Sequence, residues 1–235
     1  MVRAQTAMEL RLTLRRGESL LLTLAIPLGL LAFFGTVDVV DAPVSYLVPG
    51  VLALAVMSTA MTGLAIATGF ERQYGVLKRL GATPLPRSGL LLAKTLSVLA
   101  VEALQLVLVG ALGALLGWRF AGVRAVVIAA VFVALGTAAF AGLGLLMAGT
   151  LRAEATLAAA NGLYLVLLLV SGMVVPLDRL PEPLAAAARL LPSGALAEGM
   201  RNAFAGFGPI VRPATVLAVW AAVALAAAAR TFRWE

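Results

Sequence analysis

The chain has 235 residues, of which 62% are hydrophobic and 12% are charged. A soluble domain carries about 25% charged residues, so this composition indicates an integral membrane protein. The absence of cysteine and histidine excludes disulfides, thiol nucleophiles, thiolate or imidazole metal sites and imidazole acid–base catalysis. The net charge of +7 is explained by basic residues that flank membrane spans on the cytoplasmic side, so no nucleic-acid partner is predicted.

The first segment, 3–18, is basic and has an apolar stripe. Met8 and Leu12 lie one helical turn apart, beside a second stripe formed by Arg11 and Arg15. This pattern predicts an interfacial helix along the inner leaflet of the membrane. The alternative is a basic tail that precedes the first span.

Six apolar runs follow, and each approaches the length of a membrane helix, which needs about 20 residues to cross about 30 Å of hydrocarbon. Helices are predicted because backbone polar groups in hydrocarbon must be satisfied within the chain. The predicted fold class is therefore all-α: a polytopic membrane helical bundle, with 1–235 forming a single transmembrane domain. The predicted spans are 19–37, 42–70, 95–118, 125–151, 155–177 and 213–229.

The distribution of basic residues predicts the orientation of this bundle. Six spans place both termini on one side, and that side carries 12 of the 18 lysines and arginines. Because basic residues are enriched on the cytoplasmic side, both termini are predicted to be cytoplasmic. The outer loop 178–212 is discordant, since it holds four of the remaining six arginines.

The segment 71–94, ERQYGVLKRLGATPLPRSGLLLAK, is the longest strongly charged one on the predicted cytoplasmic side. Tyr74, Leu77 and Leu80 are three residues apart, which predicts a short amphipathic helix. Pro84 ends it, because proline removes a backbone donor and restricts the residue before it. The alternative is an ordinary basic loop.

The outer loop contains two shorter apolar stretches, 184–191 and 195–204, that are predicted to be helices. They are too short to span a membrane, so they are expected to be re-entrant or interfacial in the outer leaflet. Glu198 and Arg201 are spaced for an i,i+3 pair on the second of these helices.

Motifs that would carry chemistry are scarce. The stretch 88–95 faintly resembles a nucleotide-binding P-loop but lacks both required glycines, so this chain is not expected to bind ATP. Asp38 and Asp41 lack the further carboxylates of a hard-cation site, so they are interpreted as solvated loop acids and no metal is predicted.

Glu102 is the one ionisable residue well inside a predicted span, and Gln105 follows one turn later. Because buried charges in membranes are costly and often functional, Glu102 is either a gate, substrate contact or proton site, or a structural carboxyl. Asn161, in the fifth predicted span, has the same two interpretations.

Two motifs, together with the six predicted spans, cover almost the whole chain. The first reads Glu71-Arg72-x-x-Gly75-x-Leu77-x-x-Leu80-x-x-Thr83-Pro84-Leu85-x-Arg87, followed by Leu92-x-Lys94. The second reads Ser171-Gly172-x-x-x-Pro176-Leu177-x-x-Leu180-Pro181, then Leu191-Pro192 and Glu198-Gly199-x-Arg201. Their order and spacing resemble type-2 ATP-binding-cassette (ABC) transporter permeases, in particular small bacterial drug or antibiotic exporters of the daunorubicin-resistance kind.

The resemblance implies roles for several segments. Segment 3–18 would be a connecting helix, and 71–87 a coupling helix that docks on a separate cytoplasmic ATPase. Two ATPase copies, which hold ATP and Mg, would serve two permeases, the second being a copy or a homologue. The implied coupling residues are Glu71, Arg72, Gly75, Leu77, Leu80, Thr83, Pro84 and Arg87. Helices in 178–204 would cap the outer end, with Gly172, Pro176, Pro181, Glu198 and Arg201 as the outer-loop residues.

The second and fifth spans would line the transport path. Its candidate residues are Met57, Met61, Glu102, Asn161, Leu165, Leu169 and Met173. The resulting hypothesis is a non-enzymatic permease of the bacterial plasma membrane that moves an amphipathic or hydrophobic cargo (a drug, an antibiotic or a lipid-like molecule) outward. An ion-gradient-driven transporter is the main alternative, although no clear internal repeat is visible. A membrane enzyme acting on lipids fits poorly without histidine, cysteine or clustered carboxylates, and a non-transporting permease-like subunit stays open.

Overall fold

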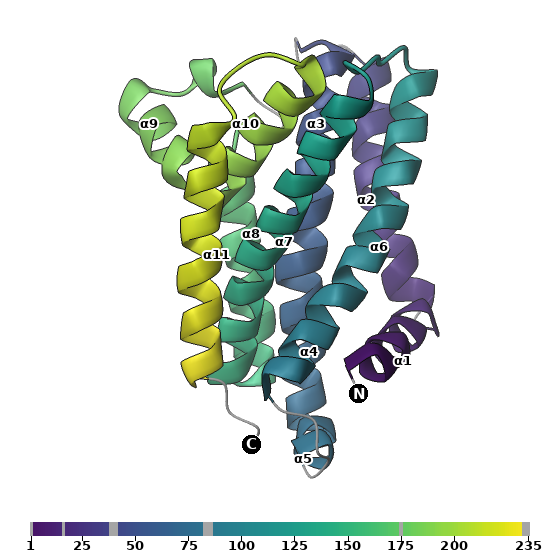
Figure 1. Cartoon of the computed structure of the whole chain (residues 1–235), viewed down its shortest axis with the longest axis vertical. Coiled ribbons are helices and arrows are strands. Elements are labelled where there is room, and N and C mark those ends of the chain that lie inside the picture. Colours follow the sequence, from purple (N-terminus) through teal and green to yellow (C-terminus); the bar gives the residue numbers. More distant parts are fainter. Residues whose placement is uncertain (1, 16, 38–41, 82–86, 174–175, 232–235) are drawn as a thin grey trace.

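The computed structural model describes residues 2–15, 17–37, 42–81, 87–173 and 176–231, and the regular elements in this part are helices (Figure 1). Long helices run side by side along one axis of the molecule. The elements are α1 (Val2–Arg15), α2 (Gly17–Thr36), α3 (Val44–Met57), the π-helix η1 (Ser58–Gly63), α4 (Leu64–Gln73), α5 (Val76–Gly81), α6 (Arg87–Leu115), α7 (Val123–Thr150), α8 (Ala153–Val170), the 3-10 helix η2 (Leu177–Arg179), α9 (Glu182–Leu190), α10 (Pro192–Ala205) and α11 (Val211–Thr231).

Within the described ranges, five helical stretches are long and apolar enough to cross a membrane. They correspond to the second through sixth predicted spans, and α2 contributes a shorter apolar stretch, Thr23–Thr36. The predicted all-α, polytopic helical bundle is therefore confirmed. The membrane-spanning stretches are Val44–Gln73, Leu92–Leu115, Val123–Thr150, Ala153–Val170 and Val211–Thr231.

The fifth span ends earlier than predicted. The expected boundary was Leu177, whereas α8 ends at Val170. The hydroxyl of Ser171 donates to the Leu168 carbonyl at 2.8 Å and accepts the Met173 amide at 3.0 Å, which satisfies backbone groups at the helix end. Gly172 then adopts a left-handed φ of +68°, a conformation that commonly ends helices.

The centre of the bundle is the α3–η1 segment, where Leu47–Met57 are buried without interruption. Glycines on α7 allow close approach to its neighbours, as small residues do between membrane helices. A Cβ on Gly142 would lie 2.8 Å from Ala224 of α11, and one on Gly144 would lie 2.7 Å from the Met61 carbonyl of η1. These positions therefore fix how closely α11 and η1 pack on α7.

The two ends of the bundle differ in construction (Figure 1). At one end, here called the α5 end, α5 projects beyond the long helices and α1 packs against α6. At the other, the α9 end, α9 and α10 precede α11, and α10 packs against α3, α7 and α11. The predicted short helices 184–191 and 195–204 are present as α9 and α10. Segment 3–18 forms the helix α1 over Val2–Arg15, and its position at the membrane interface stays a prediction.

Candidate functional site

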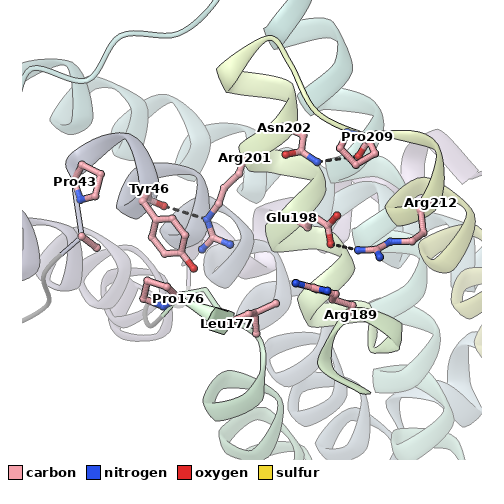
Figure 2. A pocket seen from close by; sticks show the side chains of 11 residues that line it. Pro43, Tyr46, Pro176, Leu177, Arg189, Glu198, Arg201, Asn202, Pro209 and Arg212 are labelled. Carbon is pink, nitrogen blue, oxygen red and sulfur yellow. Dashed lines mark hydrogen bonds and ion pairs between the residues drawn. The ribbon is translucent and has the colours of Figure 1, made fainter. Parts of the chain in front are cut away.

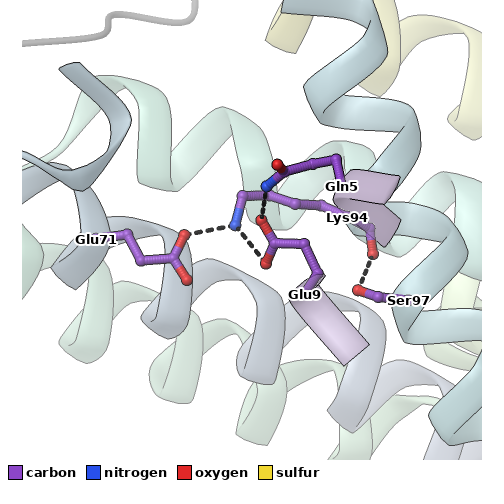
Figure 3. Close-up of polar contacts among 5 residues, drawn as sticks. All are labelled: Gln5, Glu9, Glu71, Lys94 and Ser97. Carbon is purple, nitrogen blue, oxygen red and sulfur yellow. Dashed lines mark hydrogen bonds and ion pairs between the residues drawn. The ribbon is translucent and has the colours of Figure 1, made fainter. Parts of the chain in front are cut away.

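A buried ion cluster joins three helices near the α5 end (Figure 3). Lys94 of α6 is 1% exposed, and its Nζ lies 2.5 Å from Glu71 Oε2 of α4 and 3.2 Å from Glu9 Oε2 of α1. Gln5, one turn before Glu9, donates from Nε2 to Glu9 Oε1 at 2.9 Å. Glu9, Glu71 and Lys94, the Lys94 triad, therefore connect α1, α4 and α6 through one ammonium group.

The composition of the Lys94 triad makes it sensitive to the loss of its central member. Two carboxylates share one ammonium group, which has three N–H donors. Removing one partner of a buried ion pair destabilises a protein by about 3–5 kcal/mol, since a charge is left without compensation. Loss of Lys94 would leave two carboxylates without their shared cation, whereas loss of Glu71 would leave the ion pair between Lys94 and Glu9 in place.

The two residues after Glu71 connect α4 to a different part of the bundle. The Arg72 guanidinium donates to the carbonyl of Leu151, which follows α7. Gln73 Nε2 donates to Glu154 Oε1 in the first turn of α8 at 2.8 Å. The last turn of α4 therefore contacts α6 through Glu71, which is linked to α1 by way of Lys94, and contacts the α7–α8 junction through the next two residues.

The chain then turns sharply into α5. Gly75 adopts φ +68°, which glycine reaches without steric penalty, and its amide bonds the Arg72 carbonyl at 3.0 Å. Leu77 is fully buried, whereas Tyr74 is 69% exposed and Arg79 is exposed. The predicted short helix is therefore present, with Leu77 on its inner face. The expectation that Tyr74 shares this face is wrong, because Tyr74 precedes α5 and its side chain is exposed.

Several implied coupling residues cannot be placed in this geometry. Thr83 and Pro84 lie outside the described residues, as do the side chains of Leu80 in α5 and Arg87, the first residue of α6. Glu71, Arg72, Gly75 and Leu77 lie within one stretch at the end of α4 and the start of α5, so the structure does bring these four together.

The predicted path residues fall into two separate groups. Met57, Met61 and Met173 are fully buried within the bundle. Leu165 and Leu169 of α8 are 56% and 76% exposed, and Asn161, one turn earlier, is also exposed. One chain alone therefore does not bring the two groups together, and their role in a path stays a prediction.

Glu102 belongs to a buried polar contact between α6 and α7. Its Oε2 lies 2.5 Å from Thr137 Oγ1, while its Oε1 has no hydrogen-bond partner in the described part of the chain. One turn later, Gln105 accepts from Thr59 of η1 at 3.0 Å and donates to the Thr23 carbonyl of α2 at 2.9 Å. The arrangement fits the structural interpretation of Glu102, and a gating role stays a prediction.

The expected pairing of Glu198 with Arg201 is wrong. Glu198 Oε2 accepts from Arg212 of α11 at 2.6 Å, across the turn between α10 and α11. Arg201 instead donates to the carbonyls of Gly172 and Met173, with 3.0 Å to the latter. Those carbonyls follow the end of α8, so they accept no hydrogen bond from within a helix and are available to Arg201. Arg201 therefore bonds to them and not to the carboxylate of Glu198 on its own helix.

Sequence reasoning missed two members of the Lys94 triad as site residues. Lys94 was noted in a motif but given no role, and Glu9 was not singled out. A signal for Glu9 exists, because it is the one acid in the basic segment 3–16.

The family model for the ABC-2 type transporter matches residues 2–205, which include α1 through α10 and the whole Lys94 triad. The chain belongs to the ABC-2 type transporter family. It is thus the permease subunit of an ABC transporter and a multi-pass membrane protein, and membership implies partnership with an ABC ATPase. A search of curated proteins found no match.

Proposed function

We propose that this ABC-2 permease is the membrane subunit of an ATP-driven exporter, and that a separate ATPase docks on residues 71–87. The observation that carries the proposal is the set of contacts at the last turn of α4. Three consecutive residues, Glu71–Gln73, contact α6, the α7–α8 junction and α8, and the exposed face of α5 follows at once. A protein that moves α5 therefore acts on most of the bundle.

In the proposed mechanism, these contacts transmit the movement of α5 along two routes, one to α6 and α1 and one to the α7–α8 junction. Movement of α5 shifts the end of α4, and the Lys94 triad passes that shift to α6 and α1. Arg72 passes it to the α7–α8 junction. ATP drives transport only if the cargo binds the two resulting states with different affinity, so the moving spans must also carry the cargo contacts.

The remaining features of the proposal come from family membership and the charge pattern. The ATPase holds ATP and Mg, and two copies of it serve two permeases, the second of which is a copy or a homologue. The α5 end faces the bacterial cytoplasm with both termini, which fits the 12 basic residues on that side. The exposed residues Leu165 and Leu169 of α8 then face the second permease across the path of a drug, antibiotic or lipid-like cargo moved outward.

The proposal is tested by co-purification from the native host in mild detergent, with ATP hydrolysis measured on the eluate. Arg79→Glu reverses a charge on the exposed face of α5 and should abolish recovery of ATPase activity. Arg230→Glu, at an exposed position in the last turn of α11, is the matched control and should retain it. Equal recovery from both variants would contradict docking on 71–87. A partnerless oligomer that transports under an ion gradient would favour the secondary-transporter alternative.

A further inference from the structure

A cavity of about 750 Å³ opens at the α9 end of the bundle (Figure 2). Its walls come from the start of α3, the segment before η2, the end of α9, the middle of α10 and the start of α11. The start of α3 lies far in the sequence from the other lining elements, which fall within 176–212, so the fold brings the two parts together. The cavity lies at the end opposite the coupling contacts (Figure 1).

Three arginines and one glutamate line this cavity: Arg189, Arg201, Arg212 and Glu198. Glu198 is engaged by Arg212 at 2.6 Å. Burial lowers the pKa of Arg201 to about 10, so its guanidinium remains positive at neutral pH. Arg189 is exposed to the cavity and has no carboxylate partner among the described residues. The described lining therefore carries a surplus of positive charge.

Arg201 is held in the cavity lining by contacts with an aromatic ring and two backbone carbonyls. Its guanidinium lies 3.6 Å from the centre of the Tyr46 ring and donates to the carbonyls of Gly172 and Met173. Tyr46 in turn donates from its hydroxyl to the Gly172 carbonyl at 2.7 Å. Neutral carbonyls and an aromatic ring orient the guanidinium without cancelling its charge, although the nearby Glu198 also acts on it electrostatically. Arg201 thus supplies a fixed positive charge, while Arg189 and Arg212 lie close to Glu198 (Figure 2).

Apart from Asn202, whose amide donates to the Pro209 carbonyl at 2.8 Å, the rest of the lining is apolar. Pro43, Pro176 and Pro209 contribute rings, and Leu177 and the Tyr46 ring add further apolar surface. An apolar cavity with a few convergent cationic groups suits a ligand that carries both an apolar body and an anion.

We propose that this α9-end cavity binds an anionic amphiphile, with the anionic group at Arg189 and Arg212 and the apolar body against Tyr46, Pro176 and Leu177. The anion is a phosphodiester of a lipid headgroup or the carboxylate of a free amphiphile. Three of the four arginines that make segment 178–212 discordant with the charge rule line this cavity, so ligand binding accounts for their position. The proposal does not depend on an ATPase partner.

The test uses the full-length chain in detergent, titrated with phosphatidylglycerol or phosphatidylcholine, with bound lipid counted by native mass spectrometry. The anionic lipid should bind in preference to the zwitterionic one. Arg189→Gln should weaken phosphatidylglycerol binding roughly tenfold, the loss expected for one charged hydrogen bond. It should weaken phosphatidylcholine binding less, because choline offsets the charge of that phosphodiester. Arg124→Gln, at an exposed arginine in the first turn of α7 that does not line the cavity, is the matched control and should change neither.

A second variant distinguishes electrostatic recognition from damage to the fold. Glu198→Gln removes the one carboxylate in the described lining and frees Arg212, so it should strengthen phosphatidylglycerol binding several-fold, in the opposite direction to Arg189→Gln. Competition by laurate would identify a carboxylate as the preferred anion, and its absence would identify the lipid phosphodiester; both support the site. Equal binding of the two lipids, or equal effects of Arg189→Gln and Arg124→Gln, would overturn the proposal.

Discussion

The two ends of the bundle use charged side chains in different ways. At the α5 end, Lys94 is buried and bonded to carboxylates from two other helices. At the α9 end, Arg201 is bonded to backbone carbonyls, and Arg189 has no carboxylate partner among the described residues. Charged contacts between helices can hold those helices together, whereas surplus charge around a cavity is available to a ligand. The two proposals above follow this difference, with mechanical coupling at the first end and recognition at the second.

The largest expected effect is at the centre of the Lys94 triad. Lys94→Met leaves the carboxylates of Glu9 and Glu71 without their shared cation, and it should destabilise the protein by about 3–5 kcal/mol. The measurement is thermal unfolding of the purified chain in detergent. A Tm equal to that of the unaltered chain would show that the triad adds no stability. The claim that the α5 end uses its charges to hold helices together would then be wrong.

The comparable change at the α9 end should be smaller. Arg201→Gln removes a cation over the Tyr46 ring and donors to two carbonyls, so a loss of about 2–3 kcal/mol is expected. Arg201→Lys keeps the positive charge but loses the planar guanidinium. Its stability should therefore lie between that of the unaltered chain and that of Arg201→Gln. Thermal unfolding in the same detergent orders the three chains, and a lysine variant as stable as the original would refute the role given to the planar guanidinium.

A smaller effect is expected at the turn between α4 and α5. Gly75→Ala places a Cβ at φ +68°, where the left-handed conformation costs about 1–2 kcal/mol, although no atom lies within 4 Å to clash with it. The strain lies at the α4–α5 junction. Gly75→Ala should therefore clearly reduce the ATPase activity recovered with the chain, while its Tm should fall only slightly. Gly162→Ala is the control, because that helical glycine also has open space around it and has no left-handed φ.

The smallest effect on stability is expected for the pair Glu198–Arg212. Arg212 is half exposed, and exposed ion pairs contribute at most about 1 kcal/mol. Arg212→Gln should therefore leave Tm nearly unchanged while weakening binding of phosphatidylglycerol. A large drop in Tm would make the pair a structural contact and would remove Arg212 from the proposed recognition site.

The sequence predicted the helices well because their signals are local. The apolar length of each span, and the turn residues around α5, α9 and α10, are visible without any tertiary contact. It missed the end of α8, since Val174, Val175 and Leu177 continue the apolar run while Ser171 and Gly172 end the helix through their own backbone contacts.

Long-range pairing explains the other misses. The partners Glu9 and Lys94 are 85 residues apart, and Arg201 and Tyr46 are 155 apart, so spacing along one helix carries no trace of either contact. The i,i+3 rule favoured Glu198–Arg201, but it ignores the free carbonyls at the end of α8 and the cation at the start of α11. The Leu77 position was predicted correctly from local periodicity, but the same periodicity placed Tyr74 on the buried face, and it failed there because α5 begins only at Val76.

The central claim is that the last turn of α4 transmits an ATP-dependent movement from α5 to the rest of the bundle. The chain has no native cysteine, so two spin labels can be introduced at Met8→Cys on α1 and Arg152→Cys before α8, both exposed. Their separation is measured by pulsed electron paramagnetic resonance in the complex with the co-purified ATPase. ATP should change this distance, and the double variant Glu71→Ala/Arg72→Ala, which removes both links described above, should abolish the change while the ATPase remains bound. Glu182→Ala, at an exposed carboxylate on α9, should not. An ATP-dependent change that persists in the double variant would contradict the account.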